Sequence, residues 1–222
     1  MDKERKIAIE AAEAAGYLPT LRKLVMKSTV PLWWSRSSVS FPKSISHNGT
    51  MCIVDTGEKF LGVTADHVFK QYQNDCKCFD DIECQIGNVR IDLEKYLIDS
   101  NSELDIATFD LPPILVAGSG VNIHVPSNWP PKMLVNSEMV LLGGYPGFLR
   151  EEKIDKAEFS FVTFFVPVAQ SSINHASFQL NLADSHWPDG SGGIPEGTNL
   201  GGISGGPVFR FKVKPAEHLE LA

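Results

Sequence analysis

The chain has 222 residues, of which 43% are hydrophobic and 21% are charged, so it can fold around a sizeable core. Its 20 basic and 27 acidic residues give a formal net charge of −7, which argues against nucleic acid as the main partner because phosphate binding needs a cationic surface. The sequence has no run of about 18 consecutive apolar residues, the length that a membrane-spanning helix needs.

The N-terminal segment begins with charged residues and only then becomes apolar. Glu10 and Glu13 interrupt the apolar stretch that begins at Ile7, so no signal-peptide core is present and we expect a cytoplasmic protein. The pattern predicts a short amphipathic helix that ends near Gly16, within a helical extension over residues 1–30.

All four cysteines lie in the first part of the chain, at Cys52, Cys76, Cys78 and Cys84. Without an export signal, we expect free thiols in a reducing compartment. Their spacing lacks the C-x-x-C pairs of structural zinc sites, so we expect no metal.

Short β-prone runs recur along the rest of the chain. Residues 50–54 and 59–64 bracket a turn and predict a β-hairpin, residues 31–46 predict an irregular lead-in, and residues 65–72 predict one or two helical turns. Further strands are expected over residues 82–86, 89–93, 104–111, 139–143, 159–169, 176–182 and 207–213. Two prolines, Pro112 and Pro113, separate the strands into two sets, so the sequence predicts an all-β protein in two halves.

Three segments hold residues that together suggest a hydrolytic site. His67 follows an apolar strand, Asp105 lies in an apolar strand where burial would require a partner, and Ser204 lies among four glycines. An imidazole can remove the proton of a serine hydroxyl, a buried carboxylate can fix the imidazole tautomer, and glycines let backbone N–H groups converge on an oxyanion. Each segment alone is more typical of an ordinary surface residue or loop, whereas the ordered set is far more specific.

These segments resemble a known family. The sequences TADH (64–67), DIA (105–107) and GISGGP (202–207) resemble the T-A-A-H, D-I-A and G-x-S-G-G-P segments of trypsin-like serine proteases with the chymotrypsin fold. The match covers residues 45–213. The resemblance implies two antiparallel β-barrels of the six-stranded type, the first over residues 31–113 with His67 and Asp105, the second over residues 114–222 with Ser204.

The resemblance also implies an activity. The chain is then a serine endopeptidase that needs no cofactor and cleaves a protein or peptide substrate through an acyl-enzyme. His67 acts as general base and then acid, Asp105 orients it, and Ser204 attacks the scissile carbonyl. The backbone N–H groups of Gly202 and Ser204 would form the oxyanion hole.

Departures from the family pattern refine these expectations. Val68 stands where animal members place a cysteine, and Ile203 replaces the aspartate that pairs with a cleaved N-terminus, so the pattern is closest to bacterial intracellular members. Thr198 occupies the position of the acid that selects Lys or Arg, which favours cleavage after a small or apolar residue. Only 18 residues follow Ser204, whereas the family continues for several strands, so we expect an incomplete second barrel and a further C-terminal segment.

Two other interpretations fit parts of the same pattern. The G-x-S-x-G pattern around Ser204 also occurs in lipases and esterases, but their acid and histidine would have to be the adjacent Glu217 and His218, which cannot form a triad. A catalytically silent binding module with the same fold remains open.

Overall fold

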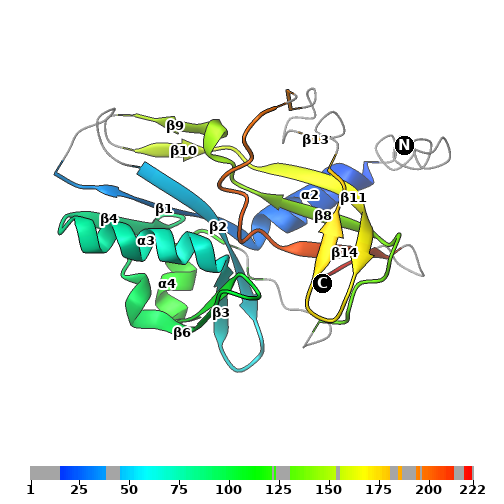
Figure 1. Cartoon of the computed structure of the whole chain (residues 1–222), viewed down its shortest axis with the longest axis horizontal. Helices are drawn as coiled ribbons and strands as arrows, with labels where there is room; N and C mark the ends of the chain where they lie inside the picture. The colour runs from blue at the N-terminus through cyan, green and yellow to red at the C-terminus, as the bar shows by residue number, and fades with distance from the viewer. Residues whose placement is uncertain are drawn as a thin grey trace.

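The computed structural model of the protein describes residues 16–38, 46–121, 123, 131–153, 156–180, 185–186, 194–195, 197–212 and 218–221. Within these ranges the fold is mostly β, with two large antiparallel sheets and few helices (Figure 1). The helix expected before Gly16 lies outside the described residues. None of the described helices is long and apolar enough to cross a lipid bilayer.

The first half of the chain forms a curled, seven-stranded sheet in the order β5-β4-β1-β2-β3-β7-β6. Every neighbouring pair is antiparallel. The strands are β1 (Thr29–Arg36), β2 (Ser46–Asp55), β3 (Phe60–Thr64), β4 (Ile82–Ile86), β5 (Val89–Ile91), β6 (Leu97–Asn101) and β7 (Ile106–Leu111), joined by helices α3 (Asp66–Cys78) and η1 (Leu93–Tyr96) and followed by α4 (Pro113–Gly118).

The curl of this sheet encloses an apolar core, the largest formed by the described residues. Helix α3 packs Phe69 against Phe109 of β7, with ring centroids 5.3 Å apart. Trp34 of β1 is buried beside the same helix, and its Nε1 donates a hydrogen bond of 2.8 Å to Asp75. Helix α3 is therefore fixed to the sheet along its length, which matters because His67 lies in its first turn.

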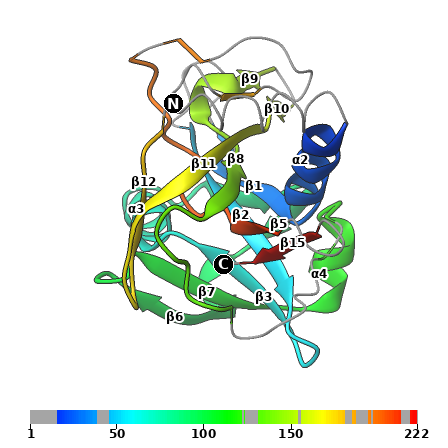
Figure 2. The ribbon, with the colours of Figure 1, turned by 90° about the vertical axis from the view of Figure 1, so that its right-hand side faces the viewer.

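The second half forms a sheet in the order β12-β11-β8-β14-β15, with β13 paired to β11. Figure 2 shows β8 and β11 above β3, β6 and β7 of the first sheet. The elements are β8 (Met139–Gly144), η2 (Gly147–Leu149), β11 (Val162–Ser171), β12 (Ala176–Phe178), β13 (Ser185–His186), β14 (Val208–Lys212) and β15 (His218–Leu221), with a separate two-stranded sheet of β9 (Arg150–Glu152) and β10 (Ala157–Phe159).

Helix α2 (Tyr17–Lys27) belongs to the core of the second sheet, although it immediately precedes β1 of the first. Leu21 and Val25 are buried, in a cluster that includes Leu141 of β8 and Phe209 of β14. Gly16, at φ 75°, directly precedes this helix. A helix therefore begins after Gly16, whereas the sequence predicted only that an earlier helix ends near this residue.

Most predicted strands are confirmed, with several corrections. The hairpin of β2 and β3 closes between Asp55 and Phe60. The lead-in predicted to be irregular is wrong at its start, because β1 runs to Arg36. The helix predicted over residues 65–72 extends to Cys78, and the run over residues 89–93 ends as the 3-10 helix η1. Strand β6 was not predicted.

Candidate active site

His67 is placed by the junction of β3 and α3. Strand β3 ends at Thr64, and Ala65 takes an extended conformation before α3 begins at Asp66. Ala65 has no side chain that can cap the helix, so the backbone N–H groups of its first turn need another acceptor. The N–H of His67 is one of these groups.

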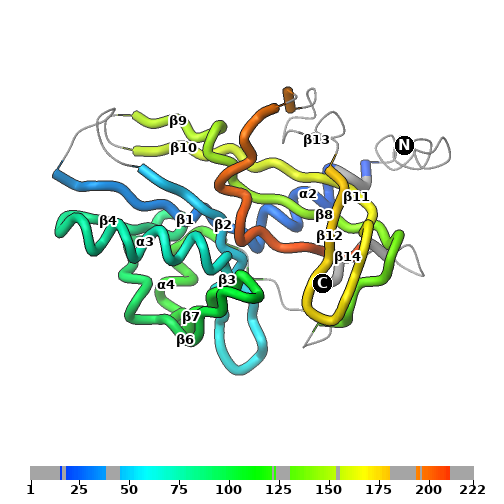
Figure 3. Tube along the Cα trace, in the orientation of Figure 1, coloured from blue at the N-terminus to red at the C-terminus, as the bar shows by residue number. Residues whose placement is uncertain are grey.

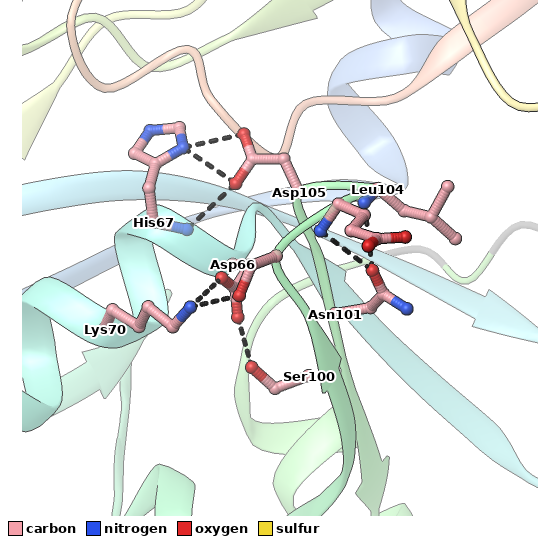
Figure 4. Close-up of polar contacts among 9 residues, drawn as sticks. Asp66, His67, Lys70, Ser100, Asn101, Leu104 and Asp105 are labelled. Carbon is pink, nitrogen blue, oxygen red and sulfur yellow. Dashed lines mark hydrogen bonds and ion pairs between the residues drawn. The ribbon is translucent and has the colours of Figure 1, made fainter.

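Asp105 supplies that acceptor and also contacts the imidazole (Figure 4). Its Oδ1 accepts the backbone N–H of His67 at 2.9 Å, and its Oδ2 lies 2.8 Å from Nδ1 of the same residue. Because an ionised carboxylate only accepts hydrogen bonds, the neutral imidazole carries its proton on Nδ1 and presents the lone pair of Nε2. This is the tautomer that a general base needs.

The expectation that Asp105 lies buried within a strand is wrong. Strand β7 begins at Ile106, and Asp105 ends the preceding turn at φ 52°, a left-handed conformation that aspartate tolerates better than most residues. The side chains of Asp105 and His67 are 51% and 59% exposed. The pair is therefore open to solvent on one side.

A second, buried carboxylate lies beneath this pair. Asp66 forms an ion pair with Lys70 at 2.7 Å and accepts a hydrogen bond from Ser100 of β6 (Figure 4). The resembled family segment has alanine at this position. Desolvation opposes ionisation of Asp66. The contacts with Lys70, Ser100 and Ser102 outweigh that cost and hold its pKa below its ordinary value.

Ser204 lies in a turn that depends on glycine. In this serine loop (residues 201–207), Gly206 N–H donates to the carbonyl of Ile203 at 2.9 Å, and Gly205 has φ 89°, as the third residue of a type II turn requires. A Cβ on Gly205 would overlap the carbonyl oxygen of Thr50 on β2. The loop can therefore approach β2 closely only with glycine at this position.

The three residues proposed from the sequence as a triad border one cavity. This cavity, of about 500 Å³, is lined by His67, Asp105 and Ser204 together with apolar side chains from β2, β3 and β14. Figure 3 shows the orange segment before β14 beside β2, where the two sheets meet. In the described part of the chain, no hydrogen bond joins His67 to Ser204. A catalytic hydrogen bond that is loose in the free enzyme often tightens only when substrate binds.

The proposed oxyanion donors are the N–H groups of Gly202 and Ser204. Gly202 has φ 100°, and a Cβ there would overlap the side chain of Asn48 and the carbonyl oxygen of Tyr145. Neither N–H donates to another group among the described residues. Both are therefore available to an oxyanion.

Thr198 does not reach this cavity. It is half-buried, and its hydroxyl donates to the carbonyl of Pro195 at 2.7 Å. The structure thus separates Thr198 from the other predicted site residues, and its predicted role in specificity has no support in the lining of this cavity.

Sequence reasoning did not identify the residues of β2 that hold the serine loop. Thr50 and Asn48 contact the loop and the segment after β8, and Arg150 donates to Asn48 Oδ1 at 2.7 Å. Asparagine and threonine in a strand carry no catalytic signal, so only the contacts reveal them.

Cys52 also lines the cavity but is unsuited to nucleophilic chemistry. Burial raises the pKa of its thiol to about 12, so the thiol is protonated at neutral pH. All four cysteines are free. Among the described residues, no three His, Cys, Asp or Glu side chains are grouped closely enough to bind a metal ion.

Comparisons with known proteins do not assign this chain to a family. No family model and no curated protein matches the sequence. One similar solved structure comes from work on how aromatic interactions drive the coupled folding and binding of the intrinsically disordered VPg protein of Sesbania mosaic virus. The similarity covers 69% of this chain and 78% of that one, at 14% identity and a TM-score of 0.33, which is too low to support an argument about this chain.

Proposed function

We propose that the protein is a trypsin-like serine endopeptidase, with His67, Asp105 and Ser204 as its catalytic triad. The observation that carries the proposal is the pairing of His67 Nδ1 with Asp105 in the cavity that Ser204 also lines. In this proposal the two sheets correspond to the two barrels of the chymotrypsin fold, and the cavity lies at their junction.

The proposed reaction is peptide hydrolysis in two stages. Ser204 Oγ attacks the scissile carbonyl carbon while Nε2 of His67 takes its proton, and the same proton then passes to the leaving amine as the acyl-enzyme forms. Water attacks the acyl-enzyme with His67 again as base, which releases the acid and restores Ser204. Asp105 stabilises the imidazolium that forms in each stage, and the N–H groups of Gly202 and Ser204 stabilise the oxyanion.

A catalytically silent binding module is the second candidate. The high exposure of Asp105 and His67, and the lack of a hydrogen bond between His67 and Ser204 in the described structure, favour it. The same cavity would then hold a peptide without cleaving it. The two candidates differ in whether Ser204 is chemically reactive.

Covalent capture by a fluorophosphonate probe separates them. We expect the wild-type protein to be labelled at Ser204 and Ser204→Ala to lose both the label and about 10⁴-fold or more of its turnover of a peptide substrate. Ser172→Ala, which changes a serine in an exposed turn, is the matched control and should retain both. Equal turnover in Ser204→Ala and the wild type would rule out the protease, and a folded protein with no label would favour the silent module.

A further inference from the structure

Thr50 is a buried residue of β2 whose polar atoms all point to the active-site region. It lies two residues before the first β2–β3 pair, formed by Cys52 and Val63, so its backbone is free for other partners on that side. Its N–H donates to the carbonyl of Ser204 at 2.9 Å, and its carbonyl accepts the hydroxyl of Thr64 at 2.6 Å. The backbone of β2 thus holds Ser204, the residue that carries the proposed nucleophile.

The hydroxyl of Thr50 makes a second link. Oγ1 donates to the carbonyl of Gly202 at 2.7 Å and accepts the N–H of Tyr145 at 2.9 Å. Tyr145 opens the connector (residues 145–147), which runs from the end of β8 to the first residue of η2. One fully buried hydroxyl therefore joins the serine loop to the connector.

The connector in turn orients the first proposed oxyanion donor. Gly147 N–H donates to the carbonyl of Gly201 at 2.6 Å. In a planar trans peptide the N–H of the next residue points opposite to that carbonyl, so this bond aims the N–H of Gly202 away from the connector. The carbonyl of Ile203, held by Gly206 N–H, fixes the N–H of Ser204 in the same way.

Four consecutive carbonyls of the serine loop, from Gly201 to Ser204, are thus held by hydrogen bonds. Thr50 provides two of the four donors, and of all four only its hydroxyl belongs to a side chain. Without that hydroxyl, the carbonyl of Gly202 and the N–H of Tyr145 would lose their partner together. The connector and the loop could then shift relative to each other, and the peptide that carries the N–H of Gly202 would turn with them.

We infer that Thr50 is a positioning residue for catalysis, whose hydroxyl sets the oxyanion hole by fixing the serine loop on the connector. The inference rests on the proposed protease function. It predicts an effect on the chemical step more than on substrate binding, because an oxyanion exists only in the transition state and the intermediates.

The test compares three variants by kcat and KM for a peptide substrate and by thermal unfolding. We expect Thr50→Val, which keeps the shape but removes the hydroxyl, to lower kcat by about 10²-fold with little change in KM. Thr50→Ser keeps the hydroxyl and should recover kcat to within about tenfold of the wild type, a loss equivalent to about 1.4 kcal/mol. Thr29→Val removes another buried hydroxyl-to-carbonyl bond, at the end of α2, and is the control for a loss of stability alone.

The outcomes are distinct. A Thr50→Val enzyme with the same kcat as Thr29→Val would overturn the inference, as would a failure of Thr50→Ser to recover activity. If Thr50→Val does not fold, Thr50→Cys replaces it, because a thiol is a weak donor and acceptor. Thr50→Cys should then lower kcat more than Thr50→Ser does, and a kcat equal to that of Thr29→Val would overturn the inference. Loss of activity in Ser204→Ala without any loss in a folded Thr50→Val would leave the protease proposal intact and reject only the role of Thr50.

Discussion

The carboxylate of Asp105 contacts both the backbone N–H and the imidazole of His67. Oδ1 caps the first turn of α3 through the N–H of His67, and Oδ2 orients the imidazole. The partial positive charge at the helix N-terminus also favours a carboxylate at this place. One exposed side chain therefore contributes both to the helix and to the proposed chemistry, and substitutions can separate the two effects.

We predict that Asp105→Asn and Asp105→Ala lose activity alike but differ in stability. The asparagine retains an oxygen that can cap α3, so its free energy of unfolding should stay near the wild-type value, whereas alanine should cost about 0.5–2 kcal/mol. Neither variant can accept the proton of Nδ1 as a carboxylate does, so kcat should fall by roughly 10⁴-fold in both. Urea unfolding and peptide turnover provide the two measurements. A wild-type kcat in Asp105→Asn would show that Asp105 has no orienting role.

At the scale of elements, the position of α3 beside β6 depends on Asp66. The carboxylate is buried at the start of the helix and bonded to Ser100 of β6 and to Lys70 one turn later. This contact fixes the helix end that carries His67 relative to the turn that carries Asp105. The separation between the side chains of His67 and Asp105, the proposed catalytic pair, thus depends on a third residue.

We predict that Asp66→Asn is destabilised by about 1–3 kcal/mol at pH 7, because it weakens buried, charge-assisted hydrogen bonds. The contacts with Lys70 and Ser100 hold the pKa of Asp66 in the folded protein below its ordinary value, so the stabilisation is present above that ordinary value and is lost as the pH falls below it. The difference in unfolding free energy between wild type and variant should therefore shrink between pH 7 and pH 3 in urea titrations. Asp80→Asn, at an exposed position, is the control. A difference that does not change with pH would contradict the role of the ionised carboxylate.

The elements that sequence reasoning missed lack the signals on which such reasoning depends. Pro31 argues against a central strand because it has no N–H. In β1, however, it lies just past the end of the pairing with β4, where the N–H of Gly87 donates to its carbonyl. In β6, Leu97 and Ile98 are exposed, so no alternation of buried and exposed residues marks it. The turn before β7 is hidden because apolar residues flank Asp105 in sequence.

The candidate site was likewise only partly predictable from the sequence. His67, Asp105 and Ser204 could be proposed from short motifs, since each combines a reactive residue with a distinctive local sequence. The close approach of β2 could not, because it is a contact between residues about 150 positions apart, such as Thr50 and Gly202, whose separation in sequence is 152. Which strand residue meets a distant loop is decided by the packing of the two sheets, and no local pattern encodes it.

At the scale of the whole molecule, the chain crosses between its two halves at several places. Helix α2 leads directly into the first sheet but buries Leu21 and Val25 in the core of the second. The serine loop precedes β14 of the second sheet but rests on β2 of the first. Arg150 of β9 likewise donates to Asn48 of β2. The burial of Leu21 and Val25 places α2 in the core of the second sheet, although the sequence suggested a separate extension over residues 1–30.

We therefore predict that Leu21→Ala destabilises both sheets together. Removing a buried leucine side chain should cost about 2–5 kcal/mol, and the links between the halves should transmit that loss to the first sheet. Amide hydrogen exchange measures each sheet separately, at residues 51–53 of β2 and at residues 162–166 of β11. Both sets should lose protection by the same free energy, whereas Leu24→Ala, on the exposed face of α2, should change either by less than about 0.5 kcal/mol. A loss confined to β11 would mean that the halves unfold independently, and the cavity between them would then open whenever the second sheet does.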